Sequence, residues 1–599
     1  MICVKHRYEP CLTSYNMKLS LYNIIQSVSN RTTKLYHLLF GMLIVCITVC
    51  YLKTDDSLMS MRYILIAQLL MIYCLIILFY SIFPRGTYIL LIVSVVGICS
   101  SEICLGLFQL LGYRSSNHYL YAVTGSFKNP GPYGGFLAIC ISLLATYHIK
   151  YNNQKQKFIS KLLYWGSSTI AIAAFIILPS TQSRSAILAL GCGMILLVFG
   201  TERIRVKIKP FLKKYGLWLT LGLAIIGTSA YLFKKPSADG RLFMDKICIK
   251  AMCENGWKGA GIGHFGGAYG KAQASYFKKQ IEENGKDDLD WRAINEHDRM
   301  TADCPDNAFN EYLFIGVEAG PITMLLFIGI IISAIIISFK RGTIWCYGMT
   351  AFAVFAMFSY PLHVKQFQIL LPILLAACVS DRQRNAQKQK GDKEESFFKN
   401  KYNLVGIVTM VAILMTLSTI IILRLPEARL YKQAENDWKK AEYWHIMEYY
   451  EYVVEDCDKL MPYMNHDYRF LFAYGQSLNK TRNYEKSDSI LKMGTEISSD
   501  PMFWNVMGNN SLALGKYREA EDRYKHAFYI VPNRLYPLYL LAKLYHEEGD
   551  ITRFLEIAEK VETIIPKIES VNTDSLRMEI INIRNKYTLL FERNENNKL

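Results

Sequence analysis

The chain has 599 residues, in which 68 Lys and Arg outnumber 51 Asp and Glu and give a formal net charge of +17. Hydrophobic residues make up 51% of the chain and are concentrated before residue 425, whereas charged residues are concentrated after that point. This division excludes a uniformly soluble enzyme, a disordered protein and a small secreted module held together by disulfides.

Apolar runs of about 20 residues, the length that crosses a bilayer, recur up to position 425 of the chain. Backbone groups inside lipid must bond within their own segment, so each run is predicted to be a helix. The runs begin near Leu35, Arg62, Thr87, Gly131, Leu162, Arg184, Tyr215, Tyr312, Thr343, His363 and Tyr402. The sequence therefore predicts an all-α chain in which residues 35–424 form a polytopic membrane helix bundle of about 11 spans.

The distribution of Lys and Arg predicts the orientation of this bundle. Residues 1–34 are too long and polar for a cleaved signal peptide, so we expect a cytoplasmic tail, with Met17 as an alternative start. With a cytoplasmic N-terminus, every second connection should be basic. The basic connections are residues 150–161, 203–214, 340–341 and 382–401. This pattern predicts that a large loop, 234–310, and the chain after residue 425 lie outside, and it explains the positive charge without a nucleic-acid partner.

Residues 428–599 contain a repeat. One unit has the spacing of a tetratricopeptide repeat, a second follows it at the usual period of about 34 residues, and an earlier unit precedes it at nearly the same spacing. The central unit is defined by Trp504, Gly508, Gly515, Tyr517, Ala520, Tyr524, Ala527 and Pro532. We expect a soluble α-solenoid whose small residues lie where paired helices touch. Such an array either binds a protein partner or serves as a scaffold that shields or dimerises the membrane part.

Two polar stretches interrupt the predicted spans. The first, residues 125–135, has two prolines and four glycines, and it predicts a turn that opens a helix. A helix N-terminus there offers backbone N–H groups to an anion, unless the stretch is only a re-entry turn. The second, residues 180–186, carries Arg184. A guanidinium at the membrane boundary indicates function, with a side chain extended to the headgroups as the alternative.

A third unusual stretch is the loop 234–310. Its glycines at 261, 263 and 266 match a dinucleotide-binding spacing, but no strand–helix–strand context surrounds them, so we expect them to permit a tight loop folding back over the membrane. The spacing of His264, His297 and Cys304 fits no standard metal site, and we expect none. Cys248 and Cys253 are candidates for a disulfide that leaves Cys304 free.

In their order and membrane placement, these motifs resemble the O-antigen ligase superfamily, which includes O-antigen ligases, O-antigen polymerases and bacterial protein O-oligosaccharyltransferases. The matching residues are Gly125–Phe127 with Asn129 and Pro130, Ser183–Ala186, Gly240 and Arg241, Gly259–Phe265, and Asn310–Leu313 with Glu318 and Gly320. The resemblance covers residues 35–424, and similar repeat arrays follow the membrane domain in some members of the superfamily.

This resemblance implies a glycosyltransferase in the bacterial inner membrane, with the large loop and the repeats in the periplasm. The enzyme would move a glycan from an undecaprenyl-pyrophosphate carrier to a lipid A core or a protein hydroxyl, without a cofactor. Arg184 and Arg241 would stabilise the departing diphosphate, because guanidinium suits bidentate phosphate recognition. Asn129, His264 and Asn310 would complete substrate binding.

The chain departs from the family at Phe309, where ligases of this superfamily carry a His that is assigned to acceptor activation. An attacking hydroxyl must lose its proton, so a base is expected nearby. Glu311 is the first candidate, with Glu318, Asp306 and His264 as substitutes. Glu311 could instead be a carboxylate that stabilises the start of its helix, and the missing His could mark a branch with a different acceptor.

Two other functions remain open from the sequence. The chain could be a glycan polymerase whose acceptor is another lipid-linked repeat unit. It could also be a transporter or a non-catalytic assembly protein whose repeats recruit partners. A transporter predicts charges deep within several spans and symmetric halves. Because Glu102 is among few such charges and no twofold repeat is evident, we expect an enzyme.

Overall fold

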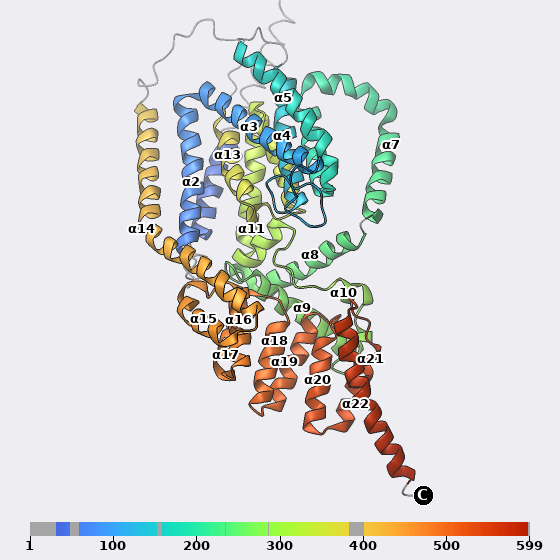
Figure 1. Ribbon diagram of the computed structural model, residues 1–599. Helices are drawn as coiled ribbons and strands as arrows, with labels where there is room; N and C mark the ends of the chain where they lie inside the picture. Colours follow the sequence, from blue (N-terminus) through green and yellow to red (C-terminus); the bar gives the residue numbers. More distant parts are fainter. Residues whose placement is uncertain are drawn as a thin grey trace, which may run out of the picture.

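The computed structural model describes residues 31–47, 59–151, 158–233, 235–285, 287–381 and 401–596. Within these ranges the chain is helical and contains no strand, which confirms the predicted all-α class. Figure 1 shows a bundle of long helices with a group of shorter helices at one end. Most of the predicted tail, residues 1–30, lies outside the described residues.

The bundle is formed by apolar helices that fall at or near each predicted run. After a helix over residues 31–47, these are α2 (Met59–Ile82), α3 (Pro84–Leu110), α4 (Pro130–Tyr151), α5 (Phe158–Ile177), α6 (Arg184–Gly200), α7 (Glu202–Phe233), α11 (Glu311–Arg341), α12 (Trp345–Ala356), α13 (Lys365–Ser380) and α14 (Lys401–Ile446). Six helices are long and apolar enough to cross a membrane, or seven if the bent pair that begins with α6 is one span. The count of about 11 stays a prediction.

Helix α4 forms the centre of the bundle and packs against α5, α6 and α12. Glycines allow this close packing, as is usual between membrane helices. A Cβ on Gly135 would collide with the ring of Phe355, and one on Gly348 would lie 2.6 Å from Leu143. The polar start of α4 is therefore fixed against α12 at the end of the bundle that faces the shorter helices.

The segment predicted as a large loop is mostly helical. It forms α8 (Lys235–Asn255), α9 (Phe265–Asn284) and the short α10 (Glu296–Thr301), and α8 and α9 share one hydrophobic core with the last repeat helices. Residues 266–270 of α9 are rich in glycine, and a Cβ on Gly266 would lie 2.5 Å from the carbonyl oxygen of Ile497. The glycines were expected to permit a tight loop. Those at the start of α9 have a further role, since they let α9 lie directly on the repeat domain.

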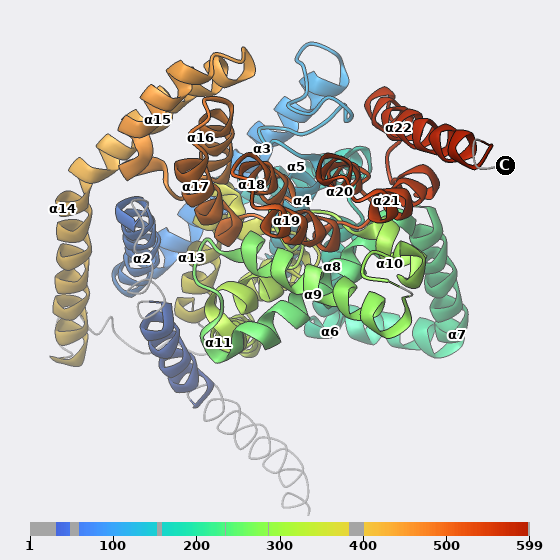
Figure 2. The same cartoon turned by 90° about the horizontal axis from the view of Figure 1, so that it is seen from below.

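The C-terminal region consists of paired helices, each packed on its neighbours in sequence. They are α15 (Tyr450–Met464), α16 (Tyr468–Lys480), α17 (Tyr484–Ile497), α18 (Met502–Ala513), α19 (Tyr517–Ile530), α20 (Tyr536–Glu548), α21 (Ile551–Thr563) and α22 (Val571–Asn596). Figure 2 shows them in a curved row beside α8, α9 and α10. Gly508 lies against the ring of Tyr524, where the repeat pattern requires a small residue. The tetratricopeptide class itself stays a prediction.

Candidate functional site

The two polar stretches predicted at span boundaries lie side by side. A Cβ on Gly134, at the start of α4, would lie 2.7 Å from Thr181 Oγ1, in the 3₁₀ turn Leu178–Thr181 before α6. Arg184 is the first residue of α6, and Ser183 caps the helix by accepting a hydrogen bond from Ala186 N at 3.3 Å. Both helices therefore direct their N-termini to the same region, as anion binding requires.

The turn before α4 is held by polar side chains of α3. Glu102 accepts hydrogen bonds from Ser126 N at 3.0 Å and from Ser126 Oγ at 2.5 Å, and Gln109 Oε1 accepts from Thr124 N and Gly125 N. Glu102 was the conspicuous charge inside a predicted span. Its hydrogen bonds satisfy the buried carboxyl group, and they hold this turn in place.

The positive charge of Arg184 acts on Arg241, and their direct pairing stays a prediction. The pKa of Arg241 lies below its usual value, first because of burial and second because of the positive charge of Arg184. Arg241 comes from α8, which is far from Arg184 in the chain. Its Nη1 donates to Phe358 O at 3.0 Å, and its guanidinium lies 5.2 Å from the centre of the Phe309 ring.

Tyr360 connects this pair to Asn129. Asn129 Nδ2 donates to Tyr360 Oη at 2.8 Å, and the Tyr360 ring meets the Phe309 ring edge-on with centroids 5.2 Å apart. The oxygen of Tyr360 also interacts with Arg241. Tyr360 was missed by sequence reasoning because it lies beside an apolar run and belongs to no motif.

Asn310 lies on the α11 side of the same cluster. It caps α11 by accepting from Leu313 N at 3.4 Å, and its side chain bonds the carboxyl of Asp245. Burial raises the pKa of Asp245 to about 6, although Asn310 and Arg241 oppose the shift. Asp245 was also missed, but its position one helical turn after Arg241 is a signal that could have revealed it.

Glu311 is almost fully buried, with 2% of its side chain exposed. Its Oε2 accepts from Leu362 N at 2.9 Å, and its Oε1 lies 3.7 Å from His363 Nδ1. Burial by itself lowers the pKa of His363, but interactions with Glu311 and then Glu318 outweigh it, so this pKa lies above its usual value. Glu311 thus orients a histidine that sequence reasoning missed, because His363 reads as the start of an apolar run.

His264 and Glu318 lie where the glycine-rich loop before α9 meets α11. Glu318 Oε1 accepts from Gly263 N at 2.9 Å, and His264 is the residue that precedes α9. The loop docks at a break in α11, where Gly320 has a φ of +87° that favours glycine. A Cβ on Gly320 would collide with Trp257 O, so the loop reaches Glu318 only because residue 320 is glycine.

The candidate disulfide between Cys248 and Cys253 is not formed. Both thiols are free, since Cys248 is buried in the core of α8 while Cys253 is exposed on the same helix. Cys304 is also free and accepts from Arg534 Nη2 at 3.1 Å. Among the described residues, no group of three or more His, Cys, Asp or Glu could hold a metal ion, and His297 pairs with Asp239 at 3.0 Å.

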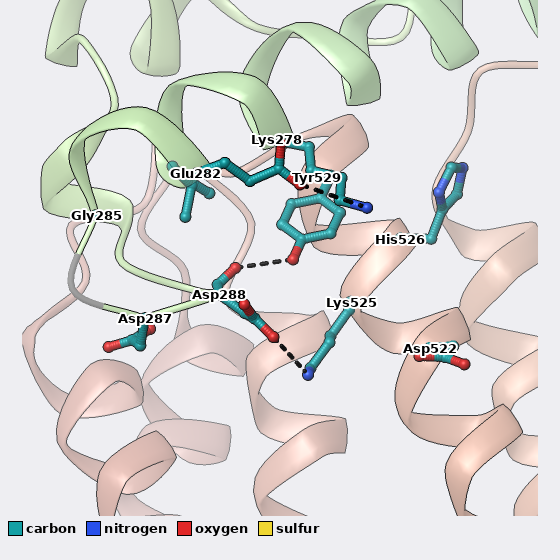
Figure 3. A pocket seen from close by; sticks show the side chains of 10 residues that line it. Lys278, Glu282, Gly285, Asp287, Asp288, Asp522, Lys525, His526 and Tyr529 are labelled. Carbon is teal, nitrogen blue, oxygen red and sulfur yellow. Dashed lines mark hydrogen bonds and ion pairs between the residues drawn. The ribbon is translucent and has the colours of Figure 1, made fainter.

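Two cavities lie where the segment 235–310 meets the repeat domain. The larger, of about 660 Å³, is shown in Figure 3 between α9 and α19. Its charged groups pair across it, with Lys525 Nζ 3.2 Å from Asp288 and Tyr529 Oη donating to Asp288 O, as expected of a polar interface. The smaller, of about 200 Å³, is lined by both His363 and Glu318.

Comparison with known proteins identifies no family for this arrangement. No family model matches the chain, and no curated protein matches it.

Proposed function

We propose that the protein is a membrane glycosyltransferase of the O-antigen ligase kind. It transfers a glycan from an undecaprenyl-pyrophosphate carrier to a lipid or protein acceptor at the outer face of a bacterial inner membrane. In this proposal the apolar helices are about 11 spans, and the C-terminal helices are a periplasmic α-solenoid of tetratricopeptide repeats. Arg184 and Arg241 bind the diphosphate, and no metal or cofactor takes part.

The observation that carries the proposal is the polar cluster around Arg241, in which Asn129 donates to Tyr360, Arg241 lies against Phe309, and the positive charge of Arg184 acts on Arg241. The two guanidinium groups repel one another, and an anion bound beside them would lower this repulsion in addition to Asp245. A diphosphate that gains negative charge as the glycosidic bond breaks is an anion of this kind. The N-termini of α4 and α6 add backbone N–H groups to the same field.

The surroundings of the arginines also favour this chemistry. Asn129 and Tyr360 provide polar groups beside Arg241, and Asp245 and Asn310 fix the other flank. His264 lies farther along, where the glycine-rich loop meets Glu318, and is suited to contact a bound glycan rather than the diphosphate. Helix α8, which carries Arg241, lies between the bundle and the C-terminal helices (Figure 1). A lipid-linked donor and an acceptor from outside the membrane can meet there.

The test is deletion of the gene, followed by analysis of lipopolysaccharide, glycoproteins and carrier-linked glycan. We expect full-length glycan to accumulate on the carrier, whereas single repeat units would indicate a polymerase. Unchanged glycans with a loss of uptake or export would overturn the proposal in favour of a transport or assembly protein.

Complementation then tests the arginines. Arg184→Ala and Arg241→Ala should each lower transfer by roughly 10²–10³-fold, as expected when a charge stabilising the transition state is lost. Arg85→Ala is the matched control. Arg85 is exposed and lies at the start of the 27-residue helix α3, whereas the residues of α3 that hold the turn before α4 lie toward its other end. All three variants should reach the membrane in equal amounts. Full activity of both site variants would contradict the assignment.

A further inference from the structure

The smaller cavity joins three parts of the chain that are far apart in sequence. It is lined by Gly263, Phe265, Gly266, Pro305, Asp306, Asn307, Phe314, Glu318, His363, His466, Tyr468, Ile497, Ser498 and Ser499. Residues up to 307 belong to the segment before α11, the next three to the bundle, and the last five to the repeat domain. The repeat domain thus forms one wall of a cavity that contains groups from the proposed active site.

We propose that this cavity is the acceptor subsite of the transferase, that it binds a sugar ring, and that His363 removes the proton from the attacking sugar hydroxyl. This inference rests on the proposed function and deepens it. It assigns the role of base to His363 rather than Glu311, and it assigns to the repeat domain a direct part in acceptor binding.

The size and lining of the cavity favour a sugar. Its volume of about 200 Å³ equals that of about seven water molecules, enough for a single sugar ring and too small for a folded peptide segment. Aromatic side chains of Phe265, Phe314 and Tyr468 offer apolar faces, and the carboxylates of Asp306 and Glu318 offer hydrogen-bond acceptors. Tyr468 Oη and Asp306 Oδ2 lie 3.4 Å apart across the boundary between the two domains, so their polar atoms converge.

His363 has the geometry of a general base. Its Nδ1 side faces Glu311 at 3.7 Å, and 31% of its side chain is exposed, whereas Glu311 is almost fully buried and does not line the cavity. A carboxylate at Nδ1 favours the proton on that nitrogen and leaves Nε2 to accept one. His363 therefore supplies from the turn Pro361–His363 the imidazole that the chain lacks at Phe309.

The reaction is a single displacement. The acceptor hydroxyl oxygen forms a bond to the anomeric carbon of the donor glycan while the bond from that carbon to the diphosphate oxygen breaks. The electron pair leaves with undecaprenyl diphosphate, whose charge Arg184 and Arg241 stabilise. The hydroxyl proton passes to His363 Nε2 and from there to water.

Tyr360 links the two parts of the proposed site. Its ring centroid lies 6.4 Å from that of His363 and 5.2 Å from that of Phe309, and Phe309 in turn contacts Arg241. The proposed base and the cation Arg241 therefore lie within one connected cluster of side chains.

The first experiment separates donor binding from transfer. Carrier-linked glycan is extracted from the deletion strain and supplied to membranes that contain each variant. We expect His363→Gln to bind undecaprenyl pyrophosphate normally and to lose transfer by roughly 10²–10⁴-fold, the range for a general base. His297→Gln, which alters another histidine paired with a carboxylate, should transfer normally. Normal transfer by His363→Gln overturns the inference and leaves the proposed function standing, whereas absence of transfer by the wild type overturns both.

The pH profile distinguishes His363 from Glu311. Transfer should fall as the pH drops through the raised pKa of His363, because the base must be unprotonated. Glu311→Gln keeps an acceptor for Leu362 N but removes the charge, so transfer should persist with its midpoint moved to lower pH. Loss of transfer at every pH in this variant, with normal binding of undecaprenyl pyrophosphate, would identify Glu311 as the base and overturn the inference.

Competition tests the acceptor class. Methyl hexosides and a short peptide rich in Ser and Thr are added separately to wild-type and Tyr468→Ala membranes. We expect a hexoside to compete with the natural acceptor in the wild type, and we expect Tyr468→Ala to raise the apparent KM for the acceptor about tenfold with little change in kcat. Competition by the peptide alone would overturn the assignment to sugar.

Discussion

The helical bundle and the repeat domain are built from the same kind of element but hold it together differently. In the repeat domain each helix packs on the next one in sequence, as α18 does on α19. In the bundle, α2 packs on α13 and α14, which come from the far end of the membrane region. Local packing can be inferred from a short pattern, whereas distant packing depends on the whole fold.

The candidate site depends on packing between distant parts of the chain. The hydrogen bond between Asn129 and Tyr360 joins residues 231 positions apart, and that between Arg241 and Phe358 joins residues 117 apart. A variant that disturbs distant packing should therefore abolish function without melting the repeats. A variant that disturbs local packing should instead lower the thermal stability of the repeats and leave transfer intact at temperatures where they stay folded.

Among variants that change packing, the largest effect is expected from Gly320→Ala. A Cβ there collides with Trp257 O at a backbone φ of +87°, so the loop that carries Gly263 cannot dock on α11. We expect transfer to fall at least tenfold and proteolysis of segment 235–310 to accelerate.

Gly97→Ala is the control for Gly320→Ala, because a Cβ on Gly97 meets nothing within 4 Å. Equal protease resistance of the two variants would show that the docked loop does not depend on the break in α11.

An intermediate effect is expected from Gly508→Ala in the repeat domain. The new methyl group overlaps the ring of Tyr524 and should destabilise this domain by about 1–3 kcal/mol. Thermal unfolding of the purified protein should show an earlier transition, while transfer at low temperature persists. Adding Tyr524→Leu should restore part of the loss, since the two residues are in contact. Loss of transfer without a change in unfolding would contradict the local character of this packing.

A smaller effect with a defined pH dependence is expected from Asp245→Asn. The folded state raises the pKa of Asp245 to about 6, so folding favours the protonated form and stability falls as the pH rises from about 4 to about 6. The variant should lack this fall and be more stable at pH 7 by roughly 1–2 kcal/mol, after allowance for solvent screening. Thermal unfolding at pH 5 and pH 7 measures the difference. A steeper fall of stability with rising pH in the variant than in the wild type would contradict the predicted direction.

The smallest effect is expected from Lys271→Ala, which removes an ion pair between α9 and Glu496. Both side chains are about half exposed, so the pair should contribute only about 0.2–1 kcal/mol. The same thermal measurement, repeated at high salt, should show wild type and variant converging. A large loss would mean that exposed charge, rather than glycine contact, holds the two domains together.

The sequence was sufficient for features that depend on local pattern. It predicted the all-α class, helices near each apolar run and a small residue at Gly508, since hydropathy and repeat spacing are properties of short stretches of chain. It described segment 234–310 as a loop because glycines and charges obscure the helical periodicity of α8 and α9.

The candidate site was only partly predictable. Arg184 was chosen from its place at the membrane boundary and then through the family resemblance, and Arg241, Asn129 and Asn310 through the resemblance. The structure places the last three around Tyr360 and Asp245. His363 could not be found, because no pattern links it to Glu311 across the two helices that separate them in the chain. The candidate disulfide could not be decided from the sequence for a related reason, since spacing alone does not tell which side of α8 each cysteine occupies.

The wall that residues 466–499 contribute to the small cavity also has a consequence for biosynthesis. When the ribosome has made the bundle but not yet residues 466–499, the cavity still lacks one side, and it closes only after those residues have been translated and have docked on α9. A product truncated before residue 466 therefore carries the arginines without an enclosed cavity beside them. The order of synthesis thus places the arginines in the chain before the wall of the cavity.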